Sequence, residues 1–181
     1  QSVANLHQVS YPTEITSTHG RRPAVPAEAP KFVKEVLGEM INRNGDDIPV
    51  SQLPDDGTYP TGTTKWEKRN IALEIPIWEP DLCIQCGRCS FVCPHAAIRT
   101  KVYPTELLKD APETFKSTAS KFREWKDGYS WTVQVAPEDC VDCGLCVENC
   151  PAKDKTNPER HAINMGAQPP IRESEAKNWD F

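Results

Sequence analysis

Eight cysteines fall in two short runs, and no other feature constrains the chain as strongly. The first run is Cys83, Cys86, Cys89 and Cys93, and the second is Cys140, Cys143, Cys146 and Cys150. Each run has the spacing C-x2-C-x2-C-x3-C, and a proline, Pro94 or Pro151, follows the fourth cysteine directly. This spacing is typical of loops that bind [4Fe–4S] clusters through thiolates. The sequence therefore predicts two [4Fe–4S] clusters that carry electrons.

The fourth cysteine of each run is expected to bind the cluster of the other run. Three thiolates at steps of three on a tight loop can reach three irons of one cubane, whereas the fourth begins a helical turn that points away. Cluster one is therefore predicted on Cys83, Cys86, Cys89 and Cys150, and cluster two on Cys140, Cys143, Cys146 and Cys93. Because each half completes the site of the other, folding of this unit should depend on metal.

Disulfides and structural zinc are the alternatives for these cysteines. Disulfides usually join distant loops, whereas all eight cysteines here are crowded into two runs of eleven residues. A four-cysteine zinc site usually takes two cysteines from each of two separated knuckles, and here each run supplies four cysteines and a proline. The doubled motif favours iron–sulfur clusters, and zinc remains the alternative.

An internal repeat surrounds the cysteines and indicates the fold class. The copies run from Pro80 to Ile98 and from Pro137 to Ile163, and the second holds an eight-residue insertion. A longer insertion, roughly 99–132, separates the copies, with helix-like turns expected around 105–109 and 117–125. We therefore predict an α+β fold with a two-cluster, bacterial-ferredoxin-like core and insertions over residues 80–181. Gly87 and Gly144 follow the second cysteine of each run and should let the backbone curl toward sulfur.

Apolar residues near the motifs are expected to keep water away from the clusters. They are Ile84, Val92, Ile98, Val141, Leu145 and Ile163.

The segment before the repeat is predicted to be irregular. Residues 1–29 are polar and proline-rich, and we expect an extended tail of a preceding domain. Residues 30–79 are expected to be a linking segment with one helix that starts at Pro30 and ends near Gly45. Its apolar stripe is Val33, Val36, Leu37, Met40 and Ile41. Residues 71–77 are apolar and β-prone.

Composition excludes several other functions. The formal net charge of −5 argues against nucleic-acid binding. No stretch approaches about 18 uninterrupted apolar residues, so no membrane span is expected. Crowded thiols without a signal peptide favour a cytoplasmic location. No nucleotide-binding or hydrolase motif occurs, so no catalytic residue is predicted. The first residue is Gln1 rather than Met, which suggests that the chain is a fragment of a longer polypeptide.

The insertion between the two copies is the most basic part of the chain. Between Arg99 and Lys126 there are seven basic and four acidic side chains, a net charge of +3 in an acidic chain. An ordinary solvated surface would explain this excess. The alternative is a docking face for an acidic electron acceptor.

Residues beside the cysteines resemble those of a known enzyme family. The family is that of the pyruvate:ferredoxin (flavodoxin) oxidoreductases, and the chain resembles it at residues 59–72, which include Glu67-Lys68-Arg69 (the EKR region), and at residues 74–78, 83–86, 93–99 and 134–140. Residues 150–155 and 162–165 extend the resemblance to nearly the whole chain. It implies that the chain is the segment of such an enzyme with two ferredoxin-type clusters and the EKR region.

The resemblance also implies an activity for the parent enzyme. Such enzymes oxidise pyruvate with coenzyme A to acetyl-CoA and carbon dioxide, and pass the electrons to ferredoxin or flavodoxin. Thiamine diphosphate and a further [4Fe–4S] cluster are expected in other domains of the parent enzyme, outside this chain. An independent two-cluster carrier, or an electron-transfer subunit of another oxidoreductase, remains the alternative. The long segment before Pro80 argues against it.

Overall fold

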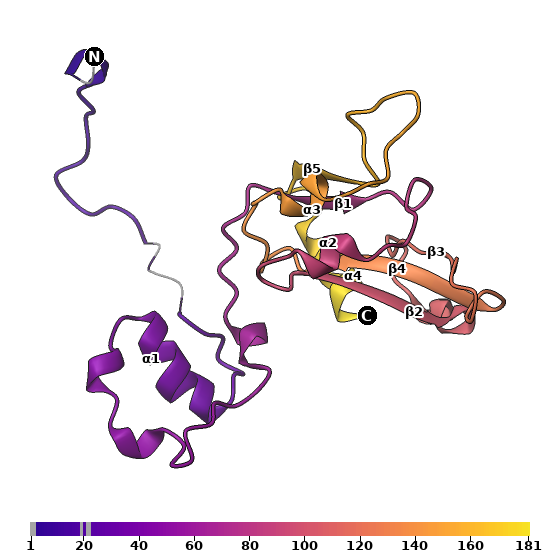
Figure 1. The fold of residues 1–181 in the computed structure, drawn as a ribbon. Coiled ribbons are helices and arrows are strands. Elements are labelled where there is room, and N and C mark those ends of the chain that lie inside the picture. The colour runs from indigo at the N-terminus through magenta and orange to yellow at the C-terminus, as the bar shows by residue number, and fades with distance from the viewer. Residues whose placement is uncertain (1–2, 19, 21–22) are drawn as a thin grey trace. The chain divides into compact units, whose positions relative to one another are not determined.

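The computed structural model describes residues 3–18, 20 and 23–181 (Figure 1). The chain divides into two compact units, Gln1–Glu67 and Lys68–Phe181. Residues 68–79 have contacts within the second unit, where Lys68 forms an ion pair with Asp139 at 2.7 Å and the Asn70 N–H donates to the carbonyl of Glu138. The predicted domain start at Pro80 stays a prediction.

The first unit is organised around one helical run. A π-helix, Val33–Leu37, continues directly into α1, Gly38–Ile41. Ala29, Val33 and Leu37 are buried, and Val25, Ile41 and Trp66 pack against them. Short 3₁₀ turns lie at Val3–Asn5, Gly45–Asp47, Val50–Gln52 and Thr63–Trp66.

The helical run ends earlier than the sequence indicated. The Asn42 N–H closes α1 on the carbonyl of Gly38, and Arg43 takes the left-handed backbone conformation at φ 70°. Gly45, which was expected to end the helix, begins the next 3₁₀ turn instead. Met40 is 44% exposed and lies at the edge of the apolar stripe.

The second unit contains two antiparallel sheets in its described residues (Figure 1). In one, β1 (Glu74–Trp78) pairs with β5 (Ile163–Ala167), so that Trp78 lies opposite Ile163. The other has the order β2-β4-β3, with β2 at Ile98–Pro104, β4 at Tyr129–Val135 and β3 at Thr118–Ala119. The first strand of the unit thus pairs with its last.

Three helices and a 3₁₀ turn complete the described part of the second unit. The short helices α2 (Arg88–Phe91) and α3 (Leu145–Glu148) follow the glycines of the two cysteine runs. The longer helix α4, Arg172–Asp180, packs on the sheet at β4. The 3₁₀ turn is Thr105–Asp110.

The core of this unit lies between the sheets and the cysteine loops. Seven buried residues form it: Trp78, Ile98, Trp131, Val133, Val135, Cys146 and Ile163. Along β4 the apolar residues Trp131, Val133 and Val135 alternate with polar ones and face this core, and the polar face of the strand is buried as well. Cys83, Cys89, Cys93 and Cys150 pack against this core, so the core holds both cysteine runs in place.

The predicted α+β class is confirmed, with one correction in the insertion. The helix-like turn expected around 105–109 is the 3₁₀ turn Thr105–Asp110. The turn expected around 117–125 is wrong at its start, because Thr118 and Ala119 pair with Trp131 and Ser130 as strand β3. Among the residues that the structure describes, no helix is long and apolar enough to cross a membrane.

Candidate iron–sulfur centres

The first cysteine loop is shaped by two left-handed residues. Gln85 has φ 62° and Gly87 has φ 71°, and α2 starts directly after Gly87. The backbone N–H of Gln85 donates to Cys83 Sγ at 3.3 Å. The Cys83 N–H bonds to the carbonyl of Pro80 at 3.2 Å and closes the turn before the loop. This conformation turns backbone N–H groups toward the sulfur atoms.

The second loop repeats this backbone conformation. Asp142 has φ 60° and Gly144 has φ 70°, at the positions equivalent to Gln85 and Gly87. The Asp142 carboxylate accepts a hydrogen bond from the Glu74 N–H, 3.1 Å away at the start of β1. The Cys140 N–H bonds to the carbonyl of Ala136 at 3.2 Å. Each loop is therefore built by the same local geometry and fastened to a neighbouring segment.

Two cavities in the described part of the chain are lined by cysteines. The first is lined by Cys83, Cys86, Cys89 and Cys150. The second is lined by Cys140, Cys143, Cys146 and Cys93. Each cavity thus receives three cysteines from one run and the fourth from the other. The structure brings together the members of each predicted set.

The walls of both cavities are otherwise largely apolar. Ile84 and Ile163 line the first cavity, and Ile98, Val141 and Leu145 line the second, as the sequence predicted for the apolar shell. Val92 is not among the lining residues of either cavity. Ile98 and Ile163 are buried, whereas Ile84 is 54% and Leu145 is 43% exposed. The apolar shell is therefore buried where the sheets line the cavities and exposed to solvent beside the loops.

Burial governs the acidity of the inner thiols. It raises the pKa of Cys89 to about 12 and that of Cys146 to about 11. Burial is also the main reason that the pKa of Cys140 is raised, a hydrogen bond from the Asp142 backbone opposes the rise, and the nearby Cys93 and Cys143 add to it. Cysteine binds iron as the thiolate, so metal binding at these residues would release their protons. All eight cysteines, each among the described residues, are free.

The residues present fit a [4Fe–4S] cluster in each cavity. Four thiols converge on one apolar cavity, which is the donor set that such clusters require. In the second site the Ala97 N–H donates to Cys93 Sγ at 3.3 Å.

The indole N–H groups of Trp78 and Trp131 are buried and have no partner within the described residues, and both side chains line the first cavity. Cluster sulfides are acceptors that such donors could use. Across the described residues, no three His, Cys, Asp or Glu side chains form a site for a single metal ion.

Sequence reasoning missed three residues that fasten the loops. Gln85 is 4% exposed, and its amide bonds to the backbone of Ala119 and of Lys121, at 2.7 Å each. Lys121 Nζ donates to the carbonyl of Cys83 at 2.6 Å. The Asp142 carboxylate likewise accepts a hydrogen bond from the Glu74 N–H and so joins the second loop to β1. The repeat held a signal for two of them, since Gln85 and Asp142 are equivalent positions.

Comparison with protein families identifies the class of the second unit. Residues 82–153 match the model of the 4Fe-4S dicluster domain, and residues 18–72 match a model named EKR, described as a domain of unknown function. The fold and this match define a ferredoxin-type, iron–sulfur-binding α+β domain. The chain as a whole is a relative of one segment of the pyruvate-flavodoxin oxidoreductases, which are enzymes. The resemblance seen in the sequence is thereby confirmed.

The similarity covers almost all of this chain and a small part of its relatives. It is 55% identical over 99% of its length to a putative pyruvate-flavodoxin oxidoreductase of Synechocystis. It is 54% identical over 98% of its length to the pyruvate-flavodoxin oxidoreductase of Trichormus variabilis. A pyruvate:ferredoxin oxidoreductase of Moorella thermoacetica is 40% identical over 97% of the chain. The chain spans only 14–15% of the length of these relatives.

Proposed function

We propose that the two cysteine sets each hold one [4Fe–4S] cluster and that the chain relays electrons within a larger pyruvate-oxidising enzyme. The observation that carries this proposal is the composition of the cavities. Cys83, Cys86 and Cys89 share one cavity with Cys150, and Cys140, Cys143 and Cys146 share the other with Cys93. This grouping agrees with the cross-ligation that the spacing predicts.

In this proposal the protein holds, orients and shields the two centres. A bound [4Fe–4S] cluster supplies reversible one-electron transfer at a potential set by its surroundings. The eight thiolates hold the irons, and the backbone N–H groups of Gln85 and Ala97 donate to cysteine sulfur. Trp78, Trp131 and Ile163 exclude water from the inner wall of the first site.

The parent enzyme supplies the rest of the reaction. The names of the relatives combine pyruvate with flavodoxin or ferredoxin. We therefore propose oxidation of pyruvate with coenzyme A to acetyl-CoA and carbon dioxide, with flavodoxin or ferredoxin as the acceptor. Thiamine diphosphate and a further [4Fe–4S] cluster belong to domains outside this chain. A cytoplasmic location suits eight free thiols.

The same proposal assigns a role to each region. Residues 80–181 form the two-cluster domain, to which β1 adds a strand. Residues 30–79 form the linking segment with one helical run, and residues 1–29 are the tail of a preceding domain. The boundary between Glu67 and Lys68 divides this linking segment into a helical part and a part that belongs to the cluster unit.

Anaerobic reconstitution of the full chain tests the proposal. Iron and acid-labile sulfide should each reach about eight per chain, with broad visible absorption that dithionite bleaches. A matched variant with Cys140, Cys143 and Cys146 changed to serine should retain no more than half of both. A colourless protein with two zinc ions and no sulfide would reject the proposal.

A second measurement tests the division of labour between this chain and its parent enzyme. The reconstituted chain alone should release no carbon dioxide from pyruvate, even when thiamine diphosphate and coenzyme A are added. The reason is that the proposed thiamine site lies in another domain. Turnover by pure chain would contradict this assignment.

A further inference from the structure

The two cysteine loops have the same backbone but opposite charge. From Cys83 to Cys93 the loop carries Arg88 and no acidic residue, a net charge of +1. From Cys140 to Cys150 it carries Asp142 and Glu148, a net charge of −2. Equivalent positions hold Gln85 and Asp142, Arg88 and Leu145, and Phe91 and Glu148. The local conformation therefore offers no reason for the two centres to differ, whereas the charge does.

Lys121 adds a second positive charge to the first site. Its Nζ lies 2.6 Å from the carbonyl oxygen of Cys83. Four bonds separate that oxygen from Cys83 Sγ, so the ammonium lies within about 8 Å of a ligand sulfur. At this range, beside a partly buried site, a charge is not fully screened by salt.

Gln85 fixes the position of Lys121. Its Oε1 accepts the backbone N–H of Lys121, and its Nε2 donates to the carbonyl of Ala119, each at 2.7 Å. The side chain is almost fully buried, so these bonds are protected from water. In the second loop the equivalent side chain is the carboxylate of Asp142, which accepts the Glu74 N–H. One position thus brings a cation to the first site and an anion to the second.

We propose that the site of Cys83, Cys86, Cys89 and Cys150 has the higher reduction potential and is the point where electrons leave the chain. This inference rests on the proposed function. Reduction adds one negative charge to a cluster, and a nearby cation stabilises that charge while a nearby anion opposes it. One electron therefore moves from the second site, which is oxidised, to the first, which is reduced. From there it reduces a one-electron acceptor protein, with no bond made or broken.

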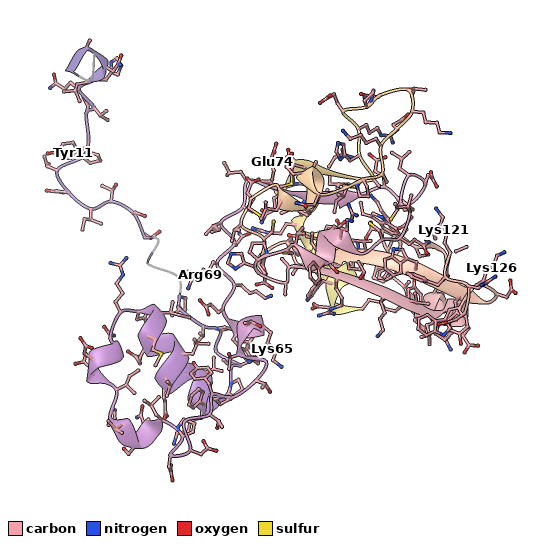
Figure 2. The ribbon with its side chains drawn as sticks, viewed as in Figure 1. Tyr11, Lys65, Arg69, Glu74, Lys121 and Lys126 are labelled. Atoms are coloured by element: carbon pink, nitrogen blue, oxygen red, sulfur yellow. The ribbon has the colours of Figure 1, made fainter. Side chains whose placement is uncertain are left out.

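The surface beside the first site suits an acidic acceptor. Arg88, Lys121, Arg123 and Lys126 are exposed, and two exposed acidic residues, Glu124 and Asp127, lie beside them, so that residues 121–127 carry a net charge of +1. Figure 2 shows Lys121 and Lys126 along the segment between β3 and β4. The second loop instead presents Asp142 and Glu148, both exposed, which would repel such a partner. The higher potential and the complementary surface thus coincide at one site.

A potentiometric titration of the reconstituted full chain, followed by electron paramagnetic resonance, tests this inference. Two one-electron transitions should appear, and Lys121→Gln should lower only the higher one. The equilibrium constant for electron transfer from the second site to the first should fall by about tenfold, which corresponds to a decrease of about 59 mV in the higher potential. Asp142→Asn should raise only the lower transition by a similar amount. Lys121→Arg should restore the original value if charge, rather than folding, is the cause.

Controls separate this inference from the proposed function. Lys109→Gln removes the same charge from the exposed 3₁₀ turn and should leave both potentials unchanged. If the chain binds its iron and sulfide but Lys121→Gln shifts the lower transition, or shifts neither transition, the exit assignment is overturned. The assignment of two clusters would be unaffected by that result. If no iron–sulfur signal forms, the proposed function fails and this inference fails with it.

Discussion

The guanidinium of Arg99, on β2, lies 3.9 Å from the centroid of the Trp179 ring, on α4. The neighbouring residue of the helix, Asn178, is 2% exposed and accepts a hydrogen bond from the Thr114 hydroxyl at 3.0 Å. The first contact holds the last helix against the sheet whose other face supports the cysteine loops, and the second joins the helix to the segment between the 3₁₀ turn and β3. The helix is therefore part of the scaffold of both sites.

Removal of the Trp179 ring should loosen this helix. Trp179→Ala removes the cation–π contact and part of the apolar contact, a loss of about 1 to 3 kcal/mol. For a unit of this size that corresponds to a decrease in Tm of about 2–10 °C. Thermal unfolding of the reconstituted chain measures it, with Trp179→Phe as the control that keeps a ring under Arg99. Equal Tm values for the alanine variant and the parent chain would mean that α4 does not stabilise the unit.

Replacement of Cys150 should damage the site of the opposite run. Cys150→Ser leaves Cys140, Cys143 and Cys146 intact and takes one ligand from the cavity of Cys83. The resonance signal of that first cluster should be altered or lost, and that of the other retained. Cys93→Ser is the matched variant, and it should affect the second cluster in the same way. Damage confined to the cluster of the mutated residue's own run would contradict the cross-ligation.

Left-handed glycines should tolerate no side chain without cost. Gly87 and Gly144 have φ near +70°, and a Cβ at either would meet no atom of the described residues within 4 Å. The left-handed conformation alone should make Gly144→Ala lower the free energy of unfolding of the reconstituted chain by about 1 to 2 kcal/mol. Gly20→Ala, where a Cβ is equally free of contacts and φ lies outside the left-handed region, is the control. Indistinguishable unfolding midpoints for both variants would show that left-handed φ is not required in the loop.

Electron transfer to an acidic carrier should depend on salt. Arg123 and Lys126 are exposed and have no hydrogen bond to the cysteine loops among the described contacts, whereas Lys121 bonds to the carbonyl of Cys83. The double variant Arg123→Glu with Lys126→Glu should slow reduction of flavodoxin in stopped flow and flatten its salt dependence. Charge complementarity acts mainly on the encounter rate, and at physiological salt it is largely screened beyond about 8 Å.

A control of equal charge tests the location of this docking surface. Lys101→Glu with Lys109→Glu makes the same change in net charge elsewhere in the second unit, on β2 and the 3₁₀ turn after it. This control should have a smaller effect on the rate. Equal effects of both pairs would indicate that net charge, rather than a surface near Lys121, governs the encounter.

The sequence predicted the parts of the site that local spacing encodes. The steps of three and four residues between the cysteines determine which thiols share a loop, and the glycine after the second cysteine marks the left-handed turn. The grouping of Cys150 with the first run was predictable for the same reason. Its role as an iron ligand remains a prediction.

Non-local pairing explains what the sequence could not predict. Gln85 and Lys121 lie 36 residues apart, and nothing in the residues around either indicates their hydrogen bond. Likewise β1 belongs to the second unit because it pairs with β5, a partner near the far end of the chain. The helix end was misjudged for a different reason. Arg43 adopts a left-handed conformation that glycine adopts more readily, and the pattern pointed to Gly45.

The exchange of fourth cysteines between the two cavities has a consequence for how such a domain can be inherited or engineered. A cut anywhere between Cys93 and Cys140 would leave each half with three cysteines of its own cavity and one that belongs to the other. Neither half would be a working module, although the motif is plainly duplicated. If the fourth cysteines bind as proposed, recombination could add or remove this pair only as a whole.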